Sequence, residues 1–210
     1  MTRAADAIRV LTVDDHPLLR DGIASLIADE SDMLLAGEAA NGREAIEQFR
    51  RLHPDVTLMD LQMPEMNGLD ALTAIRAEFP DARIIVLTTY TGDVQIMRAL
   101  KAGAFAYLLK SLLRKELLTT IRAVHAGKKA LSPEVSLELA EHAVDAALSP
   151  AELRVLRLIA EGKSNREIAA HLLTTEDSIK NHVKNILSKL GANDRTHAVV
   201  VALKRGIIEL

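Results

Sequence analysis

Acidic, hydroxyl and ammonium side chains stand at the ends of several short apolar runs of this chain. The five residues are Asp14, Asp15, Asp60, Thr88 and Lys110. Carboxylates that lie together repel one another, and they stay ionised at low cost only when a cation joins them. Mg²⁺ suits such a set because it binds one or two carboxylates together with waters and phosphate oxygens. With Mg²⁺, Lys110 and Thr88 stabilising its charge, a phosphoryl group can be transferred to Asp60.

The elements that must position these residues follow from the pattern of residues 1–126. Strands are expected at 8–13, 33–38, 56–59, 83–87 and 105–109, and helices at about 17–30, 43–52, 69–78, 93–102 and 115–126. Alternating strands and helices predict an α/β fold, a doubly wound parallel sheet with helices on both faces. Because parallel strands end on the same edge of a sheet, the five residues are expected to meet there.

Each of these residues also has a purely structural interpretation. Asp60 could cap the turn that follows it, and Asp14 or Asp15 could cap a helix. Thr88 could simply fill a strand, and Lys110 could lie at a solvated strand end. The joint occurrence at strand ends favours the phosphoryl site, whereas His16 and His53 are interpreted as loop histidines without a metal role.

Length and composition limit the class of protein. At 210 residues, with 49% hydrophobic and 26% charged residues, the chain is long enough for two globular domains. It has no cysteine, which excludes disulfides and thiolate chemistry. No apolar run approaches the roughly 20 residues of a membrane span, and the first residues lack the apolar stretch of a signal peptide. We therefore expect a cytoplasmic protein with no membrane contact.

The pattern changes after residue 126. Residues 127–147 are interpreted as a linker whose short helix opens at Ser132-Pro133-Glu134 and runs to about Ala146. Residues 148–210 predict four helices. Two of these helices start at capping boxes, Ser149-Pro150-Ala151-Glu152 and Ser164-Asn165-Arg166-Glu167.

The helix expected from about Thr175 has two different faces. Its buried stripe is Ile179, Val183, Ile186, Leu187 and Leu190, and its polar face carries Lys180, Asn181, Lys184, Asn185 and Ser188. Lysine suits guanine edges or phosphates and asparagine suits adenine, so this face is able to read a major groove, although a solvated face is the alternative. Residues 148–210 carry 10 Lys/Arg and 7 Asp/Glu, against 16 and 22 in residues 1–147, which mildly supports a polyanionic partner. A short helix, a tight turn and a longer helix form a helix-turn-helix.

The residues at the strand ends resemble the receiver domain of two-component response regulators, a flavodoxin-like (βα)5 fold. The matching positions are Asp14-Asp15, Asp60, Thr88, Tyr107 and Lys110. The resemblance implies that Asp60 accepts a phosphoryl group from the phosphohistidine of a sensor histidine kinase. It also implies that Asp15, Asp60 and the backbone carbonyl of Gln62 bind Mg²⁺, with Asp14 acting through the metal's water shell.

The same resemblance implies a switch pair. The Thr88 hydroxyl would move to the phosphoryl oxygen, and the Tyr107 ring would rotate inward behind it. Ser111 follows Lys110 where many receivers have proline, so no cis peptide bond is expected there.

Residues 148–210 resemble the LuxR-type DNA-binding domain. The matching segments include Leu148–Glu152, Gly162–Ala169, Ser178–Val183, Ile186–Gly191 and Asp194–Ala198. The resemblance implies that Lys180, Asn181 and Lys184 reach base edges. It further implies that three residues contact phosphates or hold the turn, namely His182, Lys189 and Arg195. It also implies dimerisation through the final helix, about 194–205, by Val199, Val201 and Leu203.

Together the two resemblances imply a NarL/FixJ-type regulator with a receiver (1–126), a linker (127–147) and a helix-turn-helix domain (148–210). Phosphorylation of Asp60 would favour a homodimer that binds inverted-repeat double-stranded DNA, with half-sites about 10 bp apart. We expect no dedicated enzyme activity. A haloacid-dehalogenase-like phosphohydrolase would need a second Asp where Gln62 stands. The other alternative is a receiver that no longer takes phosphate. Such a receiver would usually have lost one of the acidic residues or the lysine, and none of these is lost here.

Overall fold

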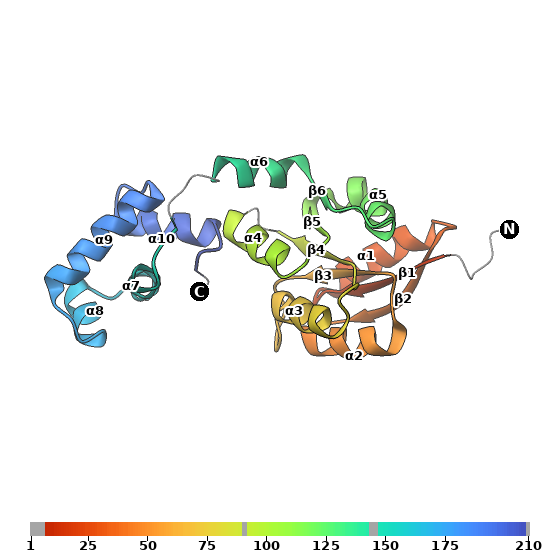
Figure 1. Ribbon diagram of the computed structural model, residues 1–210, viewed down its shortest axis with the longest axis horizontal. Coiled ribbons are helices and arrows are strands. Elements are labelled where there is room, and N and C mark those ends of the chain that lie inside the picture. The colour runs from red at the N-terminus through yellow and green to blue at the C-terminus, as the bar shows by residue number, and fades with distance from the viewer. Residues whose placement is uncertain (1–6, 90–91, 143–146, 209–210) are drawn as a thin grey trace. The chain divides into compact units, whose positions relative to one another are not determined.

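The computed structural model describes residues 7–89, 92–142 and 147–208. Contacts between residues divide the chain into two compact units (Figure 1). The first is drawn from residues 1–90 and 96–136, and the second from 91–95 and 137–210.

The first unit is built on one parallel sheet with the strand order β2-β1-β3-β4-β5-β6. The strands are β1 (Ile8–Val13), β2 (Met33–Ala39), β3 (Val56–Asp60), β4 (Ile84–Thr88), β5 (Ala106–Leu109) and β6 (Ala130–Leu131). The chain runs outward from β1 to β2 and then returns to place β3 on the other side of β1. Ligands bind in the crevice at such a reversal, so the expected site lies where the topology favours one.

Helices cover both faces of this sheet (Figure 1). They are α1 (Pro17–Ala28), α2 (Gly42–Leu52), α3 (Gly68–Glu78), α4 (Asp93–Lys101) and α5 (Leu113–His125), with a 3-10 turn at Lys110–Leu112. Ile23 of α1 and Leu117 of α5 pack in one core with sheet residues such as Leu58. On the other face, the Phe49 and Phe79 rings at α2 and α3 lie 5.0 Å apart between centroids. The predicted doubly wound α/β fold is confirmed.

The sheet has a sixth strand that the sequence interpretation placed in the linker. β6 pairs with β5 in the register Ala106↔Ala130 and Tyr107↔Leu131. A strand of two residues is too short to show a period of two, and the preceding Lys128 had suggested a turn. The following helix α6 spans Pro133–Glu141, shorter than expected, and the predicted end at Ala146 lies outside the described residues.

The second unit is helical, as predicted. Its helices after the linker are α7 (Pro150–Ala160), α8 (Asn165–His171), α9 (Glu176–Leu190) and α10 (Arg195–Lys204). Both capping boxes are present, Ser149 with Glu152 and Ser164 with Glu167. Ile179 on α9 packs with residues of the other three helices in one apolar core. Among the described helices, none is long and apolar enough to cross a membrane.

Candidate functional site

Asp60 is the last residue of β3, whose five residues are all buried. The loop that follows folds back tightly: the Gly68 amide donates to the Leu61 carbonyl at 3.0 Å. A Cβ at Gly68 would lie 1.8 Å from the Asp60 carbonyl oxygen, so only glycine permits this approach. Asn67 caps α3 by accepting a hydrogen bond from the Asp70 amide. The Pro/Asn/Gly loop therefore fixes the backbone immediately behind Asp60.

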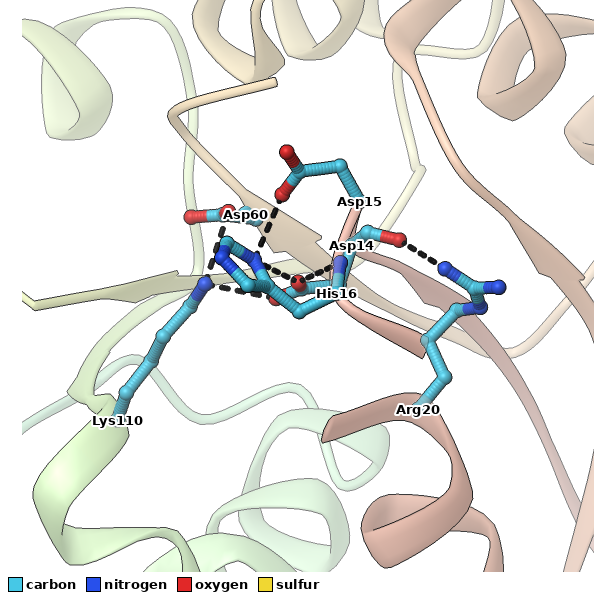
Figure 2. Close-up of polar contacts among 6 residues, drawn as sticks. All are labelled: Asp14, Asp15, His16, Arg20, Asp60 and Lys110. Carbon is cyan, nitrogen blue, oxygen red and sulfur yellow. Dashed lines mark hydrogen bonds and ion pairs between the residues drawn. The ribbon is translucent and has the colours of Figure 1, made fainter. Parts of the chain in front are cut away.

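Asp14 and Asp15 leave the carboxyl end of β1, the strand beside β3. The Asp14 carboxylate is fully buried, and its Oδ1 accepts a hydrogen bond of 2.9 Å from the His16 amide. Arg20, from α1, donates to the Asp14 carbonyl at 2.6 Å. The start of α1 thus holds Asp14 in place, and the carboxylate points toward Asp60 (Figure 2).

Lys110 joins the two buried carboxylates. Its Nζ lies 2.8 Å from Asp14 Oδ2 and 2.8 Å from Asp60 Oδ2, and the side chain is 13% exposed (Figure 2). Burial raises the pKa of Asp60, and the charge of Asp14 adds to this, while Lys110 opposes both; the net pKa lies above the ordinary value. Burial lowers the pKa of Lys110, but the two carboxylates outweigh it and raise that pKa. The ammonium therefore stays charged between the acids.

Thr88 is the last residue of β4 and Tyr107 is the second residue of β5, the next strand of the sheet, and both are buried. The pKa of Tyr107 is raised to about 12, mainly by burial. A hydrogen bond with the Thr88 side chain opposes this rise, and the charge of Asp60 adds to it. The tyrosine ring is 1% exposed, so it already occupies an inward position. The two residues of the expected switch pair thus contact each other.

His16, interpreted from the sequence as a loop histidine without a metal role, lies beside the two acids. Its Nδ1 lies 2.8 Å from Asp15 Oδ1 and 3.1 Å from Asp14 Oδ1. Asp14, Asp15, His16 and Asp60 can each place one ligand atom within 4.8 Å of the others. The available signal was its position directly after the two acids. Gln62 is exposed, and its backbone N–H donates a hydrogen bond to the Asp60 carboxylate. Its backbone carbonyl is the group that was expected to bind the metal.

The residues of the acidic site fit Mg²⁺. Asp14 Oδ2 and Asp60 Oδ2 are buried and share one ammonium, because Lys110 Nζ lies 2.8 Å from each, and Asp15 Oδ1 lies 2.8 Å from the His16 ring. Three carboxylates beside one ammonium leave a net negative charge, which a hard cation such as Mg²⁺ neutralises.

The polar face of α9 is exposed as expected. Lys180, Asn181 and Lys184 are exposed, and Lys180 Nζ lies 3.1 Å from Asp177 Oδ1. An exposed pair of this kind contributes little, so it does not prevent Lys180 from contacting another partner. His182 differs from them because it is half-buried and lines a cavity of about 400 Å³ between α7 and α9.

The other two expected phosphate contacts have partners inside the second unit. Lys189 Nζ lies 2.8 Å from Oε2 of the buried Glu152 and 3.2 Å from the Ala147 carbonyl. Arg195 donates to the Lys163 carbonyl at 2.5 Å, which ties α10 to the turn after α7. Of the two roles considered for these residues, the observed contacts are those that hold the fold.

The residues expected at the dimer surface of α10 are Val199, Val201 and Leu203, and all are partly buried against the core of the unit. Val200, between them, is 43% exposed and was not singled out from the sequence. Val200 differs in exposure from Val199 and Val201 because neighbouring positions of a helix with 3.6 residues per turn point in different directions.

We expect Glu152→Gln to destabilise the second unit by about 1 kcal/mol at pH 7. Burial raises the pKa of Glu152, but Lys189 and Ser149 outweigh it and lower that pKa below the ordinary value. The carboxylate therefore stabilises the fold above its unfolded pKa, and this contribution is lost as the pH falls through the folded pKa. Urea unfolding at pH 7 and near pH 4, followed by hydrogen exchange of α7, should show the variant's deficit shrinking in acid.

The matched control for this prediction is Glu161→Gln. Glu161 also pairs with a lysine, Lys163, but its side chain is 54% exposed. An exposed pair contributes little, so this variant should unfold like wild type. Equal effects of the two substitutions would contradict a special role for the Glu152–Lys189 pair.

Comparison with known proteins agrees with this geometry. Residues 10–122 match the response regulator receiver domain family, and residues 146–202 match the bacterial regulatory proteins of the luxR family. The response regulator protein VraR of Staphylococcus aureus is 39% identical over 207 residues, which cover 96% of this chain and 99% of VraR.

Two solved structures align with nearly the whole chain. The response regulator ChrA of a heme-sensing two-component system is 34% identical, with a TM-score of 0.58, and the alignment covers 97% of this chain and all of ChrA's (100%). The response regulator RcsB in complex with DNA is 28% identical, with a TM-score of 0.74 over 94% of this chain and 98% of that one. The chain is therefore a transcriptional response regulator, a receiver domain followed by a DNA-binding domain of the LuxR family.

Proposed function

We propose that this regulator is switched by transfer of a phosphoryl group from the phosphohistidine of a sensor histidine kinase to Asp60. The observation that carries the proposal is the position of Lys110, whose ammonium lies 2.8 Å from both Asp14 and Asp60. A fixed cation beside a buried carboxylate stabilises the charge that develops on a phosphoryl group as it arrives.

The transfer is an in-line displacement at phosphorus. A carboxylate oxygen of Asp60 forms the new P–O bond while the P–N bond to the kinase histidine breaks, and the imidazole leaves. Asp14, Asp15 and Asp60 would hold Mg²⁺, with the Gln62 carbonyl completing the set. Bound there, Mg²⁺ supplies positive charge to the phosphoryl oxygens. Lys110 supplies a second positive charge beside Asp60.

The switch would use the contact between Thr88 and Tyr107. The Thr88 hydroxyl, now hydrogen-bonded with Tyr107, would donate to a phosphoryl oxygen, and the inward ring would fill the space behind it. Tyr107 also pairs in register with Leu131 of β6. The strand that carries the switch residue is thus hydrogen-bonded to the first segment after the receiver helices, which gives a physical route from Asp60 toward the linker.

Phosphorylation would favour a homodimer that binds inverted-repeat DNA. Lys180, Asn181 and Lys184 on the exposed face of α9 would reach base edges in the major groove. The α10 residues Val199 and Leu203 would contribute to the dimer surface. A cytoplasmic location fits these partners.

A phosphohydrolase that uses Asp60 as nucleophile is the less favoured alternative. Such an enzyme needs a general acid two residues further on, and Gln62 has no ionisable group. Asp60 is therefore proposed as a phosphoryl acceptor that loses its phosphate slowly.

The proposal is tested by incubating the full-length protein with acetyl phosphate and Mg²⁺ and measuring its intact mass. Wild type is expected to gain one phosphoryl group, whereas Asp60→Asn gains none because an amide is not a nucleophile for phosphorus. Asp81→Asn, an exposed aspartate in a turn, is the matched control and should label like wild type. Labelling of Asp60→Asn to the wild-type extent would show that the acceptor lies elsewhere.

A further inference from the structure

We propose that His16 is an additional metal ligand of the acidic site and shifts its preference toward divalent transition metals such as Co²⁺ and Zn²⁺. The inference rests on the proposed use of Asp14, Asp15 and Asp60 as a metal site. It adds a residue to that site and names the class of cation that the added residue selects.

The position of the His16 ring is set by the start of α1. Its backbone amide donates to Asp14 Oδ1 at 2.9 Å, which holds the residue beside the carboxylates. Ring atom Nδ1 then lies 2.8 Å from Asp15 Oδ1 and 3.1 Å from Asp14 Oδ1. Figure 2 shows the ring beside the carboxylates of Asp14 and Asp15, and the side chain is otherwise exposed to solvent.

These separations match those of ligands around one ion. Two ligand atoms that lie about 2.1 Å from a common metal and at right angles are about 3.0 Å apart, and opposite ligands are about 4.2 Å apart. The His16 Nδ1 distances of 2.8 and 3.1 Å bracket the first value. The four ligand atoms of Asp14, Asp15, His16 and Asp60 lie within 4.8 Å of one another, so a small contraction completes the set.

The buried carboxylate oxygens supply independent support. Asp14 and Asp60 are 0% and 2% exposed, and a single ammonium, Lys110 Nζ, lies 2.8 Å from both carboxylates. One cation compensates two buried carboxylates only in part, so a net negative charge remains for a metal ion to neutralise. The ring of His16 lies at the solvent side of the same acids, where its side chain is 68% exposed and a cation is able to enter.

The chemical identity of the added ligand decides which cation the site binds more tightly. Mg²⁺ prefers an all-oxygen shell, whereas imidazole nitrogen suits Zn²⁺, Ni²⁺ and related transition metals. Three carboxylates and one imidazole therefore make a mixed site in which loss of the imidazole weakens transition-metal binding more than Mg²⁺ binding.

The test compares His16→Asn with wild type by calorimetric titration of the full-length protein with Co²⁺ and, separately, with Mg²⁺. Calorimetry is suitable because the chain has no tryptophan to report binding. Co²⁺ is the probe because its visible absorption changes with the ligand set. Asparagine is favoured at a helix N-cap, the position of His16, so the variant should fold.

We expect His16→Asn to weaken Co²⁺ binding about tenfold or more and to change its absorption spectrum, while the Mg²⁺ affinity changes less than about threefold. The control is His53→Asn, an exposed histidine whose left-handed backbone, with φ of 44°, asparagine tolerates. This control should retain wild-type Co²⁺ binding.

Equal weakening for both cations would overturn the inference, because His16 would then only position the carboxylates. Unchanged or tighter Co²⁺ binding would also overturn it, since the ring would be a hydrogen-bonding partner that competes with metal. Failure of wild type to bind Mg²⁺ at all would instead refute the metal site of the proposed function, so the two failures are distinguishable.

Discussion

Replacing Lys110 with methionine is expected to destabilise the metal-free receiver by about 3 kcal/mol at pH 7. The ammonium lies 2.8 Å from two carboxylates, and both acids are almost fully buried. Methionine keeps most of the apolar stem but removes the ammonium, and so leaves the charges of Asp14 and Asp60 uncompensated. Uncompensated charges in a buried setting account for the largest single-residue effects on stability. Urea unfolding followed by hydrogen exchange of β1 and β3 measures the receiver separately from the second unit.

The stability that Lys110→Met loses should depend on the Mg²⁺ concentration. A cation bound by the acids replaces the lost positive charge, and binding to the folded state alone adds stability by mass action. Saturating Mg²⁺ should therefore recover more stability in Lys110→Met than in wild type. The control Lys115→Met removes an exposed lysine from α5 and should change stability by less than about 0.5 kcal/mol. A Lys110 variant as stable as this control would show that the ion pairs with Asp14 and Asp60 are unimportant for the fold.

The receiver fold was predictable because its signals are local and repeated. Each of the five main strands is an apolar run, and parallel topology brings their ends together without further information. Asp14, Asp60 and Lys110 therefore contact one another, and Thr88 ends the strand next to that of Asp60, as the strand pattern predicted. The same logic did not reach β6, because a strand of two residues carries no periodicity and is recognised only by its pairing with β5.

Side-chain partners were less predictable than elements. The position of Lys189 on α9 suggested a phosphate contact, yet its nearest carboxylate belongs to Glu152, which is 37 residues away in the sequence. Burial of Glu152 results from the packing of α7 against α9 and leaves no local pattern in the sequence. The contacts of His16 with Asp14 and Asp15 depend on how its side chain is oriented at the start of α1, and its position directly after the two acids is the only sequence signal for them.

Substitution of both Lys180 and Asn181 by alanine is expected to weaken binding to a specific DNA site by about 100-fold or more. Each side chain is exposed on α9 and is proposed to contact a base edge, and one good base contact is typically worth about 1–3 kcal/mol. Because neither residue packs in the core, the stability of the second unit should stay within about 0.5 kcal/mol of wild type. Titration of a duplex selected from random sequences by the wild-type protein measures the affinity.

Binding to an unrelated duplex separates base contacts from simple charge. Loss of one lysine removes one phosphate-neutralising charge, which weakens non-specific binding only modestly. Arg157→Ala is the matched control, because it removes one exposed positive charge from α7 and leaves α9 intact. The double variant should lose most of its preference for the selected duplex, whereas Arg157→Ala keeps that preference. If both proteins retain the same ratio of specific to non-specific affinity, the exposed face of α9 does not read sequence, and the groove-reading element must be sought elsewhere in the second unit.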